Sequence, residues 1–171
     1  MLQTLCVFLL PALLITAAAS DVMSLRIPNW LTLLTAILFF PMALATHMPW
    51  AEFGSHITAG VILFVVGFLF FQAGIFGGGD SKLMAAAGLW FGTAKMLPFL
   101  FMTALAGGVL ALFVAFWSAF MISWEIEGDS APFATLGKKL RMLGPNVPYG
   151  FAFALGGILA FKDSWWMTVI N

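Results

Sequence analysis

The sequence predicts an all-α membrane protein, a polytopic bundle of about six transmembrane helices, and its composition and charge spacing carry that prediction. Of its 171 residues, 63% are hydrophobic and 8% are charged, against about 45–50% and 25% in ordinary soluble domains. A soluble domain needs a charged surface, and seven basic plus seven acidic side chains are too few to cover one. We therefore expect lipid to surround most of the chain.

Composition also excludes several other classes of protein. The formal net charge is zero, which gives no reason to expect a nucleic-acid partner. The single cysteine, Cys6, excludes a disulfide framework and a cysteine-rich zinc module. No repeat or low-complexity linker divides the chain, so we expect one integral membrane domain over residues 1–171.

The individual spans follow from the stretches that lack charge, because a spanning helix needs about 20 apolar residues. We predict helices near 2–20, 29–47, 57–76, 80–96, 99–122 and 148–168. The fourth segment is the shortest, with its apolar core confined between Lys82 and Lys95. It crosses the membrane only if Asp80 begins it and Lys95 extends to the interface. A re-entrant segment is the alternative.

Basic residues favour the six-span arrangement, because Lys and Arg accumulate in short cytoplasmic loops. Six spans put five basic residues on one side and two on the other, whereas a re-entrant fourth segment gives four and three. The five are Arg26, Lys82, Lys138, Lys139 and Arg141, and the two are Lys95 and Lys162. This arrangement places both termini outside the cytoplasm.

The N-terminal stretch also has features of a cleaved signal peptide, since Ala17-Ala18-Ala19 offers small residues for a signal peptidase. It lacks the basic residues that precede the apolar part of such a peptide. Arg26, directly after the segment, favours an N-terminus outside the cytoplasm, which is the reverse of signal-peptide insertion. We therefore prefer the first span.

Two acidic residues at predicted span ends are candidates for function, because ionisable groups are costly at membrane depth. Asp21 ends the first predicted span. Asp80 begins the fourth, after Gly77-Gly78-Gly79. The second span leaves the face that carries Asp21 and the third returns to it, so both aspartates belong to one face. The alternative for each aspartate alone is a helix cap, or an ion pair with Arg26 or Lys82.

Two carboxylates that meet in low-dielectric surroundings do not both ionise easily, so one tends to keep a proton while the other stays charged. That pair of states suits peptide hydrolysis by an activated water, in which one carboxylate takes a proton from water and the other donates one. The three glycines leave room for a substrate backbone. Such a run also serves simply as a flexible loop.

At this point the sequence resembles a known family. Gly77-Gly78-Gly79-Asp80 is similar to the G-x-G-D motif of intramembrane aspartyl proteases. The segment from Asp21 through Arg26 to Ile27-Pro28-Asn29 resembles the first-aspartate motif of type IV prepilin peptidases. Pro148-Tyr149-Gly150, followed by a helix rich in small residues, resembles that family as well. Three elements in this order are far more specific than four letters alone.

The resemblance implies an aspartic endopeptidase that removes the leader peptide from prepilins at the cytoplasmic face of the bacterial inner membrane. It carries over Asp21 and Asp80 as the catalytic pair and implies no cofactor or metal. The implied partners are a prepilin, through its leader peptide and N-terminal helix, and membrane lipid. Larger members have a soluble insertion with paired cysteines and an added methyltransferase activity. This sequence has no Cys-x-x-Cys and resembles the short, tight-adherence (Flp) form, so we expect no methylation.

Other residues near the two aspartates receive supporting interpretations. Arg26 and Lys82 could neutralise the pair or orient substrate. The preference of basic residues for the cytoplasmic side of a membrane explains the presence of both residues without a role in the site, and we prefer that interpretation. Pro28 and Asn29 are expected to shape the loop before the second helix. His47 and His56 are assigned to the outer loop, and five tryptophans to an interfacial belt: Trp50, Trp90, Trp124, Trp165 and Trp166. Residues 133–143 have the pattern of an interfacial amphipathic helix.

Two further function classes are open alternatives at this stage. A small transporter or proton-conducting bundle would relay ions through the same aspartates. Its ionisable groups would be expected at mid-depth, where the predicted spans are apolar. A non-catalytic assembly factor of a pilus or secretion system would leave the paired aspartate motifs unexplained.

Overall fold

The computed structural model describes residues 2–125, 149–162 and 164–168, and all of its regular structure is helical. Three of these helices contain segments long and apolar enough to cross a membrane: Val7–Ser24, Trp50–Gln72 and Gly78–Trp117. A shorter apolar helix covers Asn29–Ala45. The predicted all-α membrane bundle is confirmed at this level.

The helices follow the predicted order along the chain. Their bounds are α1 (Leu2–Ser24), α2 (Asn29–Ala45), α3 (Trp50–Gln72), α4 (Gly78–Glu125), α6 (Tyr149–Phe161) and α7 (Trp165–Thr168). The segment predicted as one helix over 148–168 therefore contains two, because α6 ends at Phe161 before α7 begins. The amphipathic helix predicted over 133–143 lies outside the described residues.

α3 begins seven residues earlier than predicted, and this corrects the interpretation of His56. Pro49 precedes the first turn with an extended backbone, at φ −57° and ψ 144°, and Glu52 lies within that turn. A carboxylate there interacts favourably with the helix dipole. His56 is therefore a residue of α3 rather than of an outer loop, and it is 1% exposed.

α4 is broken at Gly92, whereas the prediction placed the break between 96 and 99. Gly92 has φ 65° and ψ 175°, a conformation that essentially only glycine adopts. Pro98, which falls in the gap between the two predicted helices, lies inside the second half of α4. The two halves of α4 thus correspond to the fourth and fifth predicted helices, with a boundary set by glycine.

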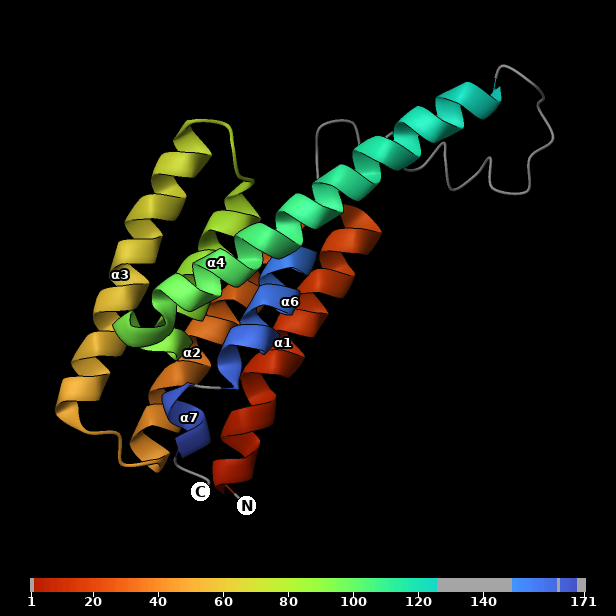
Figure 1. Ribbon diagram of the computed structural model, residues 1–171. Coiled ribbons are helices and arrows are strands. Elements are labelled where there is room, and N and C mark those ends of the chain that lie inside the picture. Colours follow the sequence, from red (N-terminus) through yellow and green to blue (C-terminus); the bar gives the residue numbers. More distant parts are fainter. Residues whose placement is uncertain (1, 126–148, 163, 169–171) are drawn as a thin grey trace.

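The chain reverses direction at this break, as the green part of the ribbon in Figure 1 shows. Contacts with α6 follow the reversal. Phe91 and Phe99, on opposite sides of Gly92, stack with their ring centroids 4.5 Å apart, and Phe91 also contacts Phe161 near the end of α6. Farther along, Gly107 lies beside Tyr149 at the start of α6. The second half of α4 therefore runs antiparallel to α6.

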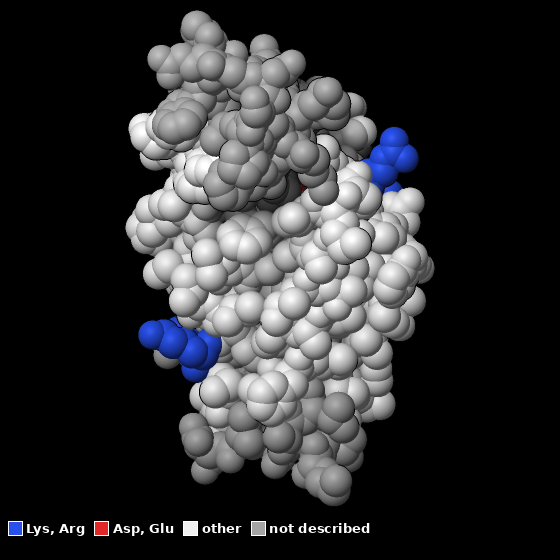
Figure 2. Space-filling view, turned by 90° about the vertical axis from the view of Figure 1, so that its right-hand side faces the viewer, with Lys and Arg blue, Asp and Glu red and all other residues white. Residues whose placement is uncertain are grey.

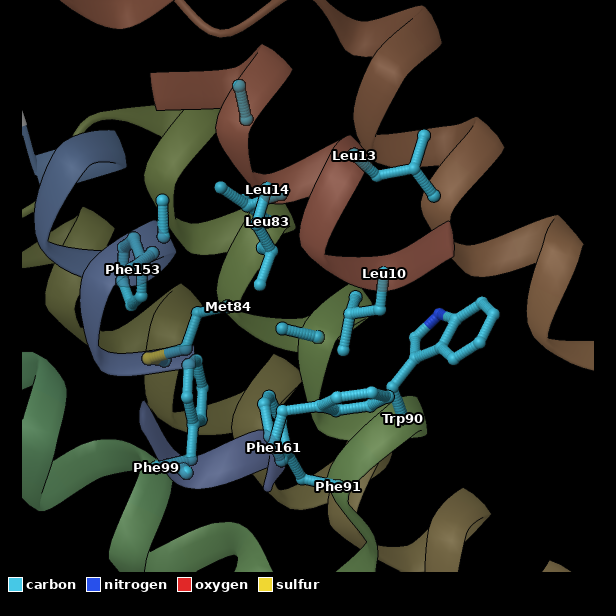
Figure 3. Packing of buried hydrophobic residues seen from close by; sticks show 14 of the residues in the cluster. Leu10, Leu13, Leu14, Leu83, Met84, Trp90, Phe91, Phe99, Phe153 and Phe161 are labelled. Atoms are coloured by element: carbon cyan, nitrogen blue, oxygen red, sulfur yellow. The ribbon is translucent and has the colours of Figure 1, made fainter. Parts of the chain in front are cut away.

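The core lies between α1, the two halves of α4, and α6 (Figure 3). Leu10 and Leu14 of α1 pack there with Leu83 and Met84 of α4 and Phe153 of α6, each at most 1% exposed. Outside this core many large apolar side chains are exposed, as lipid-facing positions of a membrane bundle would be.

Trp90 and Trp166 belong to this core, so their assignment to an interfacial belt was wrong. Both side chains are fully buried, and their ring centroids lie 5.0 Å apart. The Trp90 indole N–H donates to the Thr35 carbonyl at 2.8 Å, and the Trp166 indole N–H donates to the Trp90 carbonyl at 2.7 Å. These hydrogen bonds satisfy the polar atom of each buried ring.

Candidate active site

Asp21 lies in the last turn of α1, and its side chain is 5% exposed. Its Oδ2 atom accepts a hydrogen bond of 2.7 Å from the backbone N–H of Gly150, in the first turn of α6. The first N–H groups of a helix have no partner within the helix, so they are available to an acceptor of this kind. The contact joins residues that are 129 positions apart in the sequence.

Asp80 lies in the first turn of α4, as predicted, directly after the glycine run. Its Oδ2 atom accepts the Gly77 N–H at 3.2 Å, and the Ser81 hydroxyl donates to the Gly77 carbonyl at 3.1 Å. The other oxygen, Oδ1, is buried and has no hydrogen-bond partner within the described part of the chain. Asp80 therefore keeps one carboxyl oxygen available for another partner.

Glycines make two close approaches around these aspartates. A Cβ atom on Gly150 would lie 2.8 Å from Asp21 Cβ and 2.9 Å from Asp21 Oδ2. A Cβ atom on Gly79 would lie 3.0 Å from Ile27 Cβ and 3.1 Å from the Ile27 carbonyl oxygen. Both separations are shorter than ordinary van der Waals contact. The start of α6 and the glycine run can approach α1 and its following loop because these residues lack side chains.

These contacts bring one end of the bundle together, which we call the site end: the end of α1, the loop 25–28, the residues 76–82 and the start of α6. The carboxylates of Asp21 and Asp80 are near enough to interact electrostatically. Parity of the predicted spans placed both aspartates on one face, and the structure brings them together there.

The loop between α1 and α2 is held by two side chains from the end of α1. The hydroxyl groups of Ser20 and Ser24 donate to the Arg26 carbonyl at 3.0 Å and 3.2 Å. Leu25 adopts φ 53°, and Pro28 precedes α2 with an extended backbone. Arg26 thus contributes its carbonyl to the loop, and its side chain is exposed. The two serines are site-end residues that the sequence analysis missed.

Lys82 and Asn29 are paired with each other rather than with the aspartates. The Lys82 ammonium group donates to the Asn29 side-chain oxygen at 2.8 Å, which links the start of α4 to the start of α2. Within residues 2–125, 149–162 and 164–168, no Lys or Arg forms an ion pair with Asp21 or Asp80. The pairing of the aspartates with Arg26 or Lys82, considered from sequence, is not observed.

Tyr149 closes the other side of the site end. Its ring contacts Phe76, with centroids 5.1 Å apart, and Phe76 also contacts Phe153 of α6. Phe76 was not singled out from sequence, although its position directly before the glycine run could have indicated it. Pro148 lies outside the described residues. A Cβ atom on Gly78 would lie 3.5 Å from the Phe71 ring, which is an ordinary van der Waals distance.

Little acidic surface is visible on the face shown in Figure 2. Red appears there only inside a hollow beside the residues drawn in grey, while two groups of basic side chains stand out toward opposite ends of the molecule. The band between the basic groups is uncharged. This distribution suits a chain whose ends face water and whose middle faces lipid.

The arrangement has the parts needed for acid–base chemistry on a peptide bond. Two carboxylates lie near enough to influence each other electrostatically. Asp21 accepts a backbone N–H, and Asp80 has one oxygen with no hydrogen-bond partner in the described part of the chain. A proton donor and a proton acceptor next to a shared water can together hydrolyse an amide.

Comparison with known proteins agrees with this chemistry. Residues 8–112 match the type IV leader peptidase family. The matched segment contains both aspartates and the glycine run, and it covers more than half of the chain. No curated protein and no solved structure matches the chain in the corresponding searches.

Proposed function

Since the chain belongs to the type IV leader peptidase family, a family of aspartic endopeptidases, we propose that it removes the leader peptide of a prepilin with Asp21 and Asp80 as its catalytic pair. The observation that carries the proposal is the junction of three helices at the site end. There the Gly150 N–H donates to Asp21, while Asp80 Oδ1 has no hydrogen-bond partner among the residues that the structure describes.

The proposed reaction uses one water molecule and both carboxyl groups. The ionised aspartate accepts a proton as the water oxygen attacks the peptide carbonyl carbon. The protonated aspartate donates its proton to the carbonyl oxygen and, as the C–N bond breaks, a proton reaches the leaving amine. The Gly150 N–H fixes Asp21 throughout, because that hydrogen bond originates from a helix rather than from a mobile side chain.

The proposal includes the membrane arrangement. Six spans result if each half of α4 crosses separately, with α1, α2, α3 and α6 as the others. Arg26 and Lys82 then lie at the site end, and Lys95 and Lys162 lie at the opposite end. Together with Lys138, Lys139 and Arg141, this charge distribution favours a site end that faces the cytoplasm of a bacterial inner membrane.

The proposed subtype is the short, tight-adherence (Flp) form. The support is the single cysteine of the sequence, which leaves no Cys-x-x-Cys motif of the kind that the larger members carry. The proposed activity is therefore cleavage without methylation of the new N-terminus.

Purified protein in detergent, incubated with a prepilin, tests the proposal. We expect a shorter product with a new N-terminus at the leader junction, and no transfer of label from labelled S-adenosylmethionine. Metal chelators and serine- or cysteine-directed reagents should not prevent the cleavage. Failure to cleave prepilins of any pilus type would overturn the proposal and favour the transporter or assembly-factor alternatives.

A further inference from the structure

A groove between α2, α3 and α4 begins beside the candidate active site. Its volume is about 600 Å³, and Phe64 and Lys82 on its rim also line a second hollow of about 310 Å³. The second hollow includes Gly78 and Ser81, the residues on either side of Gly79-Asp80. Because the two cavities share Phe64 and Lys82, they form one path, which leads from the neighbourhood of Asp80 along the surface between α2, α3 and α4.

The polarity of the groove changes along its length. Its polar side chains are Asn29, Thr32 and Lys82, all near the site end. Farther from that end the lining residues that the structure describes are all apolar: Leu33 and Ala36 of α2, Ile57, Gly60 and Val61 of α3, and Ala85, Ala86 and Leu89 of α4. From Lys82 to Leu89 the groove follows α4 for about 10 Å, at about 1.5 Å per residue, and it changes from polar to apolar along that length.

Several of its walls are built from small residues. Ala36, Gly60, Ala85 and Ala86 come from three different helices. The larger side chains of Val61 and Phe64 lie beside them, and each is 58% exposed. Small residues allow the backbone of another helix to approach closely inside a membrane. The groove is therefore shaped for an apolar helix that enters sideways from the lipid.

We infer that this groove binds the apolar N-terminal helix of the substrate and thereby delivers the leader junction to Asp21 and Asp80. The inference rests on the proposed function. A substrate of this kind is apolar where it crosses the membrane and polar at the junction, and the groove has the same order of polarity. Its continuity with the residues around Asp80 favours a substrate helix over a structural lipid, whose binding would not require a path to the site.

A matched pair of variants on α4 tests the inference. Ala85→Leu fills the groove, whereas Ala104→Leu makes the same change at an exposed position outside both cavities. Two substrates are compared: a full-length prepilin, and a short peptide that spans the leader junction without the apolar helix. We expect Ala85→Leu to raise KM for the prepilin at least about tenfold more than for the peptide. Ala104→Leu should change neither.

Equal effects of Ala85→Leu on both substrates, or no effect on either, would overturn the groove assignment while leaving the peptidase proposal intact. If the unmodified protein cleaves neither substrate, that result would instead overturn the proposed function.

Photo-crosslinking gives a second measurement that does not depend on turnover. A photoreactive residue replaces Val61 in the groove, or Leu112, which is 73% exposed outside it, in the Asp80→Asn background. We expect a crosslink between position 61 and the apolar helix of the prepilin, and none from position 112. Crosslinks from position 61 to lipid alone, with prepilin present in excess, would contradict the inference.

Discussion

Gly150 is the residue that connects α6 to the candidate site, through its N–H and through its missing side chain. The N–H donates to Asp21 Oδ2 at 2.7 Å, and the absent Cβ leaves the space that the Asp21 side chain occupies. A substituent at this position would meet a buried carboxylate rather than the flexible tip of a long side chain. The position of Asp21 is therefore determined by a glycine.

We expect Gly150→Ala to displace Asp21 and to reduce leader cleavage at least about tenfold, because catalytic groups tolerate little displacement. Gly108→Ala is the matched control, since a Cβ atom there has no neighbour within 4 Å. The measurement is the initial rate of prepilin processing at equal protein levels in membranes. A Gly150→Ala rate equal to that of Gly108→Ala would show that this contact does not position Asp21.

At the residue scale, sequence reasoning singled out Asp21 and Asp80, whose catalytic role stays a prediction, but it did not show how the two side chains are held. Span parity was sufficient to place Asp21 and Asp80 on one face. The hydrogen bond from Gly150 depends on how α6 docks against α1, and this packing has no signal in local sequence. The same limit applies to Lys82, whose partner Asn29 belongs to another helix.

Among the elements, α4 is the one whose course depends on the backbone conformation of a single residue, Gly92. At Gly92 a Cβ atom would lie 3.0 Å from the His56 ring and 3.3 Å from the Ser55 hydroxyl oxygen, and the backbone has φ 65°. Ser55 accepts the Thr93 N–H at 3.1 Å, just beyond the break. The His56 Nδ1 atom donates to the Leu89 carbonyl at 2.7 Å, just before it. Two adjacent residues of α3 therefore support both sides of the break.

We expect Gly92→Ala to destabilise the protein by about 1–3 kcal/mol, because a side chain is strained in this backbone region and would also press on His56. Gly54→Ala in α3 is the control, since it has open space and a helical backbone. It should leave stability unchanged or slightly increased. Thermal unfolding in detergent measures both, and equal midpoints for the two variants would contradict this account of the break.

Sequence reasoning found the order of the main helices but not which of their side chains are buried, and the reason is physical. Hydropathy and charge spacing identify apolar stretches, and α2 was predicted to within two residues at its end. The same signals cannot separate a lipid-facing side chain from a buried one, since both are apolar. Trp90, Trp166 and His56 were consequently assigned to interfaces, although packing between helices buries all three.

For the molecule as a whole, the two ends differ in their charges and in their contacts. The site end carries Arg26 and Lys82, and the opposite end carries Lys95 and Lys162 beside the break and the end of α6. The basic side chains in Figure 2 are likewise separated by an uncharged band. The five-to-two charge split over six spans remains a prediction, because it includes three residues of the segment 126–148.

Reporter fusions test that topology directly. Fusions placed after Asn171 and within 128–137 should report opposite sides of the membrane, with the 128–137 fusion in the cytoplasm. The reason is that Lys138, Lys139 and Arg141, directly after residues 128–137, favour retention of this part of the chain on the cytoplasmic side. Reports from the same side would contradict six spans and support a re-entrant fourth segment.

The central claim is that Asp21 and Asp80 act as one catalytic unit, and prepilin processing by Asp21→Asn, Asp80→Asn and the double variant tests it most directly. Asparagine keeps the shape of the side chain but cannot exchange the proton. Each single variant should therefore lose at least about a hundredfold in rate, with the double little worse than either. Glu52→Gln, at the start of α3, should process normally at matched membrane levels. Substantial processing by either single aspartate variant would contradict the account.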